Sequence, residues 1–230
     1  MRRRTGSPLG AHTAKEAGLT LVTLGVGVLF AIAGALAERL ASVWPADEAR
    51  GRAPGPRTVV LAAVSGVAAS AIVARSELPW WATAAYLGLL ALLLVLAATD
   101  LEQRRLPHVV LDPLIVLAVL FVPFNPSVEP LDALIGAVAA VAFLGGVALV
   151  VRGGLALGDL YLVTPIGLML GWPVIFVALF VAAFLAAGAS LALLAARRVG
   201  MRSYIPFGPF LVAGAVLALL LDGRALTIVR

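Results

Sequence analysis

Residues 80–100 of the chain are WWATAAYLGLLALLLVLAATD, a run with no charged side chain before the aspartate that ends it. A helix of about 20 consecutive apolar residues crosses the hydrocarbon core of a bilayer, which is about 30 Å thick. The run lacks the alternation of apolar and polar residues that a membrane barrel strand needs. We therefore predict that it forms a membrane-spanning helix, whose backbone satisfies its own hydrogen bonds.

Similar apolar runs fill most of the chain. Besides 80–99, they lie at about 18–37, 58–74, 109–122, 132–151, 160–170, 173–196 and 206–221. Hydrophobic residues make up 62% of the 230 residues and charged residues only 13%, so the composition is not that of a soluble globular domain. We predict an all-α fold: a polytopic integral membrane helical bundle of about eight apolar segments over residues 18–230, preceded by a polar N-terminal tail over residues 1–17.

Arginine residues gather in four internal links, at 38–57, 100–108, 152–158 and 197–205, whereas the links between them carry only Arg75. Cytoplasmic loops of membrane proteins are enriched in Arg and Lys, so we place these four links in the cytoplasm and both termini on the other side. The basic N-terminal tail favours the opposite orientation, but the four links together contain more Arg residues than the tail contains Arg and Lys residues. Since such flanking charges account for the net charge of +5, we expect a lipid bilayer and no nucleic acid as partner.

Two aspartates stand where apolar segments end or begin. Asp100 closes the segment 80–99, and Asp159 opens the segment 160–170. Two spans lie between them, and two crossings return the chain to the same face, so both carboxylates are expected at one membrane depth. Two carboxylates held close together at the edge of a low-dielectric region can share one proton.

A shared proton suits peptide hydrolysis. The ionised carboxylate takes a proton from water, and the protonated one polarises a carbonyl and later supplies a proton. This chemistry needs neither thiol nor metal, and the chain has no cysteine, which excludes disulfides, thiol catalysis and cysteine-ligated zinc. From spacing alone, each aspartate is better explained as a helix cap or as the partner of a nearby arginine than as a catalytic group.

Three short motifs carry a resemblance to the type IV prepilin peptidases. Asp100, followed after five residues by Leu106-Pro107, resembles the first aspartate motif of that family. Leu157-Gly158-Asp159 resembles the second, the Gly-x-Gly-Asp motif shared with other membrane aspartyl proteases. Ile205-Pro-Phe-Gly-Pro-Phe210 looks like the C-terminal Pro-Phe-Gly-Pro signature, and Asp132-Ala-Leu-Ile-Gly136 like the start of a family helix. The resemblance covers roughly residues 80–221.

The resemblance implies a function. It implies Asp100 and Asp159 as the catalytic pair of an aspartic endopeptidase with no metal and no organic cofactor. It implies as substrate a type IV prepilin or a pilin-like secretion subunit, whose short basic leader is removed just before the apolar helix. It also implies a multi-pass protein of the cell inner (cytoplasmic) membrane, with the active site on the cytoplasmic side.

The chain departs from the family pattern in four places. Ala156 stands at the first glycine of Gly-x-Gly-Asp, Tyr161 stands where a lysine is common, and His108 follows Leu106-Pro107 where an acid or amide is usual. Long family members carry a cysteine-rich domain between the first two spans, associated with methylation of the new pilin N-terminus. The corresponding link here, 38–57, has no cysteine, so the chain resembles a short form that cleaves without methylating.

Two other classes of protein fit an apolar chain with aspartates. One is a small transporter or channel whose aspartates bind protons or cations. The other is a catalytically inactive relative that serves as an assembly factor. A transporter should hold its carboxylates near the bilayer midplane, whereas a peptidase needs them at a water-accessible edge. The positions of Asp100 and Asp159 at segment ends favour the peptidase.

Overall fold

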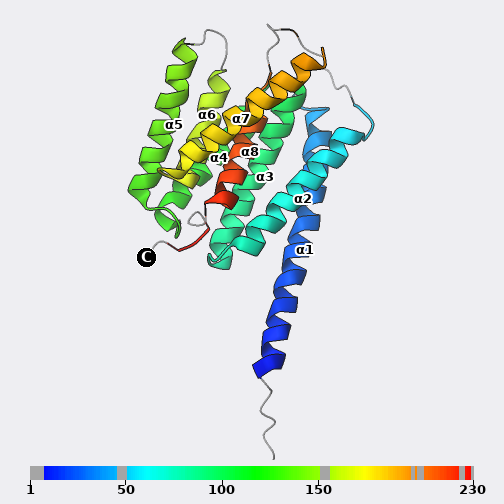
Figure 1. Cartoon of the computed structure of the whole chain (residues 1–230), viewed down its shortest axis with the longest axis vertical. Coiled ribbons are helices and arrows are strands. Elements are labelled where there is room, and N and C mark those ends of the chain that lie inside the picture. The colour runs from blue at the N-terminus through cyan, green and yellow to red at the C-terminus, as the bar shows by residue number, and fades with distance from the viewer. Residues whose placement is uncertain are drawn as a thin grey trace, which may run out of the picture.

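A computed structural model describes residues 8–45, 51–150, 156–197, 200, 205–222 and 226–228. Within these ranges the chain forms eight α-helices, one short 3-10 helix and no strand. The helices are α1 (Pro8–Ala41), α2 (Pro56–Arg75), α3 (Trp80–Gln103), α4 (His108–Phe121), η1 (Val122–Phe124), α5 (Pro130–Val150), α6 (Leu157–Leu170), α7 (Val174–Ala195) and α8 (Gly208–Leu221). The prediction of an all-α helical bundle is confirmed (Figure 1).

In the described part of the chain, five helices are long and apolar enough to cross a membrane: residues Ala17–Ala41 of α1, then α2, α3, α5 and α7. The apolar helices α4, α6 and α8 are shorter, at 14 residues each. At 1.5 Å per residue each spans about 21 Å, less than the hydrocarbon thickness. The chain is therefore a multi-pass membrane protein in which three long helices come first, and short and long helices alternate from α3 onward.

Two helix boundaries bear on the predicted segments. The break predicted at Gly171-Trp172-Pro173 is confirmed, since α6 ends at Leu170 and α7 begins at Val174. Gly171 has a positive φ of 67°, which glycine adopts without a Cβ penalty. The first helix already begins at Pro8 rather than at residue 18, because hydropathy marks lipid contact and not the start of helical backbone. Residues 1–7 of the predicted tail lie outside the described residues.

The helices alternate in direction along the chain. In Figure 1, α1, α3, α5 and α7 all run upward, so the helix ends that lead into the arginine-bearing links lie together at the top. The N-terminal half of α1 extends below the bundle, and the C-terminus lies near the bottom. This arrangement agrees with the crossing argument, which places Asp100 and Asp159 on one face.

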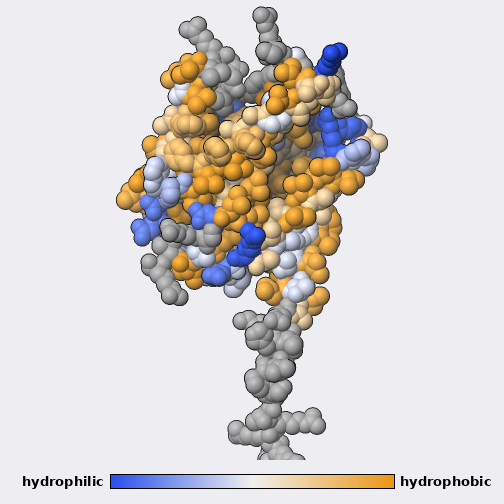
Figure 2. All heavy atoms as spheres, viewed as in Figure 1, coloured by the Kyte–Doolittle hydropathy of each residue, from blue (hydrophilic) through white to orange (hydrophobic). Residues whose placement is uncertain are grey.

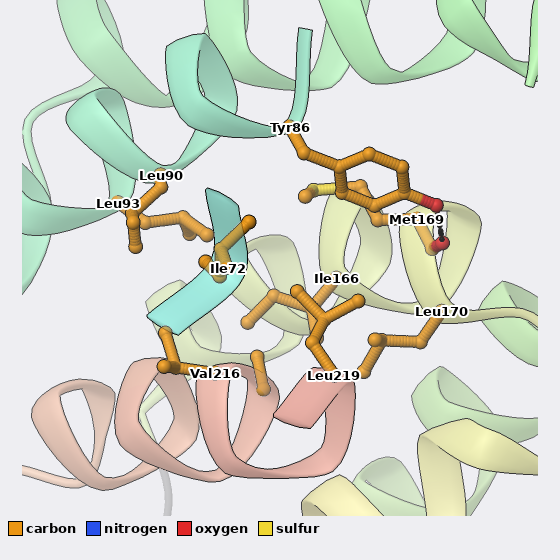
Figure 3. Close-up of a pocket in the computed structure, with 10 residues that line it drawn as sticks. Ile72, Tyr86, Leu90, Leu93, Ile166, Met169, Leu170, Val216 and Leu219 are labelled. Carbon is orange, nitrogen blue, oxygen red and sulfur yellow. Dashed lines mark hydrogen bonds between the residues drawn. The ribbon is translucent and has the colours of Figure 1, made fainter. Parts of the chain in front are cut away.

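Helix α3 lies at the centre of the bundle. In an apolar 18-residue stretch of α3, 56% of the residues are buried inside the bundle. The corresponding share is 17–33% in the other four long helices. The Tyr86 hydroxyl donates to the Met169 carbonyl oxygen at 3.1 Å and closes the core between α3 and α6 (Figure 3). The cavity beside this contact measures only about 10 Å³, too small for a ligand larger than one water. The densest part of the core is therefore a packing feature rather than a site.

Close backbone contact fixes α6 against α5. A Cβ added at Gly136 would lie 2.9 Å from the Gly167 carbonyl oxygen, and one added at Gly167 would lie 2.6 Å from Ala137 Cα. Small residues at such crossings allow membrane helices to pack by van der Waals contact, which drives helix association in lipid. The position of α6, which carries Asp159, is set by this contact.

Candidate active site

Asp100 lies in the last turn of α3, and its side chain is buried although it ends an apolar helix. The residue is only 5% exposed. Its Oδ2 accepts a hydrogen bond from the backbone N–H of Gly208, the first residue of α8, at 3.0 Å. Helix α3 ends three residues later, where Arg104 adopts a left-handed conformation and its N–H donates to the Asp100 carbonyl at 2.8 Å. The carboxylate is thus held by a donor from the far end of the sequence.

Asp159 is the third residue of α6 and is 2% exposed. Its Oδ2 accepts the backbone N–H of Ala156 at 3.1 Å, so the side chain satisfies one of the free donors at the helix start. Ala156 has φ −86° and ψ 151°, a conformation open to any residue. The alanine that replaces the first glycine of the motif therefore fits this backbone without strain.

The three motifs meet at one end of the bundle. A Cβ added at Gly208 would lie 2.6 Å from Asp100 Oδ2 and 3.4 Å from Leu162 Cδ2, and Leu162 follows Asp159 by one turn of α6. A Cβ added at Gly158 would lie 3.0 Å from Leu106 Cδ1, so the glycine of the second motif packs on the Leu-Pro of the first. Asp100 and Asp159 are close enough to interact electrostatically.

The alternative interpretations of the two aspartates can be compared with this geometry. Within the described part of the chain neither carboxylate forms an ion pair with an arginine. Asp159 does cap its helix through Ala156, but it is also buried and close enough to Asp100 to interact with it electrostatically. Burying an ionised carboxylate costs free energy, and burying two of them near each other costs more. Helix capping alone gives no reason for this cost, since an exposed side chain can cap a helix equally well.

Two positions that depart from the family pattern touch each other. The rings of His108 and Tyr161 lie edge to face with centroids 5.6 Å apart, joining the start of α4 to α6. His108 Nδ1 also lies 3.2 Å from Asp112 Oδ1, on a surface where both side chains are exposed. Sequence reasoning treated His108 and Tyr161 separately, and no sequence signal relates them.

A charged cluster ties the α1–α2 link to the end of α3. Glu38 is buried, accepts the Thr58 hydroxyl at 2.7 Å and forms an ion pair with Arg52. Arg52 and Arg57 both pair with Glu102, at 3.3 and 3.1 Å. Glu102 therefore takes part in a charged network two residues beyond Asp100.

The described residues contain no group of three or more His, Cys, Asp or Glu side chains placed to hold a metal ion. At this end of the bundle lie the two carboxylates and the backbone N–H groups that hold them. This set can activate water and protonate a leaving group.

Residues 87–191 match the type IV leader peptidase family. The prepilin leader peptidase/N-methyltransferase of Bacillus subtilis (strain 168) is 31% identical over 138 residues, which are 57% of this chain and 53% of that protein. The proteins of the same name from Aeromonas salmonicida (strain A449) and Burkholderia pseudomallei (strain 1026b) are 31% identical over 156 residues and 33% identical over 172 residues. These matches cover 66% and 72% of this chain, and 54% and 55% of those proteins.

The chain spans about half the length of the curated relatives it matches. No solved structure matches it. The resemblance inferred from three short motifs is thus confirmed: residues 87–191, which contain both Asp100 and Asp159, match the type IV leader peptidase family.

Proposed function

We propose that this chain is a membrane-embedded aspartic endopeptidase that removes the basic leader from type IV prepilins or pilin-like secretion subunits. The observation that carries the proposal is the meeting of three sequence motifs around two buried carboxylates, Asp100 and Asp159. The first half of the name of the relatives, prepilin leader peptidase/N-methyltransferase, supports the substrate class.

The proposed reaction uses the two aspartates as one acid–base unit. One carboxylate is ionised and takes a proton from a water molecule, which attacks the carbonyl carbon of the scissile peptide bond. The other is protonated and donates a hydrogen bond to the carbonyl oxygen, where negative charge develops. The leaving amine then takes a proton from the pair, and the carboxyl and amine products separate. The Gly208 N–H and Ala156 N–H hold the carboxylates in place for these steps.

The site belongs at the cytoplasmic face of the cell inner membrane in this proposal. Asp100 and Asp159 lie at the end of the bundle that bears the arginine-rich links, which favour the cytoplasm. A basic leader made in the cytoplasm reaches that face without crossing the bilayer. Their location at helix ends, rather than at the bilayer midplane, disfavours a transporter or channel.

The test is co-expression with candidate prepilins, with leader loss followed on a gel. Asp100→Asn and Asp159→Asn should each abolish most cleavage, because an amide cannot exchange a proton as a carboxyl group does. The double variant should be little worse than either single one, since residues that act as a unit are not additive. Asp112→Asn is the matched control, because Asp112 is exposed on α4. Normal cleavage by a stable Asp100→Asn or Asp159→Asn protein would end the aspartic-peptidase proposal.

A further inference from the structure

An apolar groove is lined by residues of α2, α3 and α8. Its volume is about 460 Å³, within the range of pockets that hold ligands. In Figure 1 α3 is seen between α2 and α8, and Figure 2 shows from the same side that this face is mostly apolar. The groove is distinct from the closed core of Figure 3.

One end of the groove lies beside Asp100. Ala97 and Leu101 line the groove and stand on either side of Asp100 along α3. Pro209 also lines it and directly follows Gly208, whose N–H holds Asp100. The end of the groove is therefore adjacent to Asp100 on two separate helices, α3 and α8.

From that end the groove leads into the membrane. Its α3 wall is made by Leu90, Leu94, Ala97 and Leu101, spaced so that they form one stripe on the helix surface. Eleven residues of helix correspond to about 16 Å. On α8 the groove is lined from Pro209, at the end near Asp100, to Leu220. The result is an apolar groove that begins at residues next to Asp100 and covers about half of the hydrocarbon thickness.

We propose that this groove binds the apolar helix of the substrate, in register with the bond to be cut. This inference rests on the proposed function. A substrate cleaved just before an apolar helix needs two surfaces in one order: carboxylates at the membrane edge, then an apolar channel leading away from them. Helices dock into such grooves through one apolar face, and small residues such as Ala97 and Ala213 allow close approach in lipid.

A second apolar groove provides the comparison. It measures about 530 Å³, is lined by Trp81, Ala85, Leu117 and neighbouring residues of α3 and α4, and so resembles the first in size and chemistry. Ala85 precedes Asp100 by fifteen residues of the same helix, a distance of about 22 Å. A lipid chain would enter either groove, whereas a substrate held for cleavage should use only the groove that reaches Asp100.

The first experiment fills each groove in turn. Ala213 and Ala85 are both half-buried groove residues, so Ala213→Phe and Ala85→Phe form a matched pair. We expect Ala213→Phe to lower kcat/KM for a full-length prepilin on the order of tenfold, mainly through KM, because it removes binding and not chemistry. Ala85→Phe should stay within about twofold of the parent. Equal activity of the two variants would overturn the proposal.

The second experiment detects the helix directly and does not depend on the stability of Ala213→Phe. The chain has no cysteine, so Leu217→Cys in the groove and Leu117→Cys in the comparison groove provide single thiols at exposed positions. Leu217 lies eight residues beyond Pro209, about 12 Å along α8. A prepilin with a cysteine about eight residues after its cleavage site should cross-link to Leu217→Cys and not to Leu117→Cys.

The outcomes separate this inference from the proposed function. Leader removal by the parent protein without a selective cross-link at position 217 would refute the groove and leave the peptidase standing. A selective cross-link without any leader removal would keep the groove as a helix-binding surface and refute the peptidase.

Discussion

Adding one methyl group at Gly208 should disable the proposed site without disturbing the bundle. Gly208 opens α8 and donates its N–H to Asp100. In a Gly208→Ala variant the new Cβ would lie 2.6 Å from Asp100 Oδ2, whereas ordinary contact begins at 3.4 Å. The carboxylate must therefore move by about 0.8 Å, because the Gly208 backbone is fixed by the start of α8.

The size of the effect follows from that displacement. A misplacement of about 1 Å at a reacting group can cost on the order of 100-fold in rate. We therefore expect Gly208→Ala to lower kcat for prepilin cleavage by roughly 10- to 100-fold and to leave KM nearly unchanged. The fold should tolerate the change, since alanine is a better helix residue than glycine by about 1 kcal/mol.

The assay is leader removal from a co-expressed prepilin over a time course, with the amount of enzyme in the membrane measured in parallel. Gly188→Ala is the control, because it adds the same methyl group within α7 where nothing lies within 4 Å. Wild-type cleavage by a stable Gly208→Ala protein would show that the contact with Asp100 does not position a catalytic group.

Three further predictions concern topology, modification and stability. Arg105→Cys should react with an impermeant thiol reagent only after cells are opened, whereas Glu129→Cys should react in intact cells; the reverse pattern would invert the proposed orientation. A pilin processed by this chain with a methyl donor present should carry no N-methyl group by mass spectrometry, since the 38–57 link has no cysteine; a methylated N-terminus would refute this. Thr58→Val should destabilise the bundle by about 1.5–3 kcal/mol in detergent unfolding, because it removes a hydrogen bond to the buried Glu38 carboxylate; an unchanged transition would contradict that role.

Hydropathy predicted the helices better than their ends. The apolar run 80–99 corresponds to α3, and the break before Pro173 separates α6 from α7 as expected. The start of α1 at Pro8 was not predicted, because a polar sequence can continue a helix beyond the lipid. The domain division into a tail over 1–17 and a peptidase domain over 18–230 stays a prediction.

The sequence predicted which residues make up the candidate site, but not which of them touch one another. The sequence pointed to Asp100 and Asp159, and it placed the Pro-Phe-Gly-Pro run near them by resemblance only. The structure adds that the Gly208 N–H of this run donates to Asp100, and that Leu106 packs on Gly158. It also brings His108 and Tyr161 together. These contacts join residues that are far apart in the chain, and none of them has a periodic or compositional signal.

The apolar runs of the sequence are enough to show that the chain crosses a membrane repeatedly, and the two runs between Asp100 and Asp159 predict that both carboxylates lie on one face. Which helices are neighbours is seen only in the packed bundle. Lipid is as apolar as the helix surfaces, so hydropathy does not select one packing over another. The choice depends on local shape, such as the close approach of Gly136 to Gly167 and of Gly208 to Asp100, and that packing creates both the buried carboxylate pair and the groove beside it.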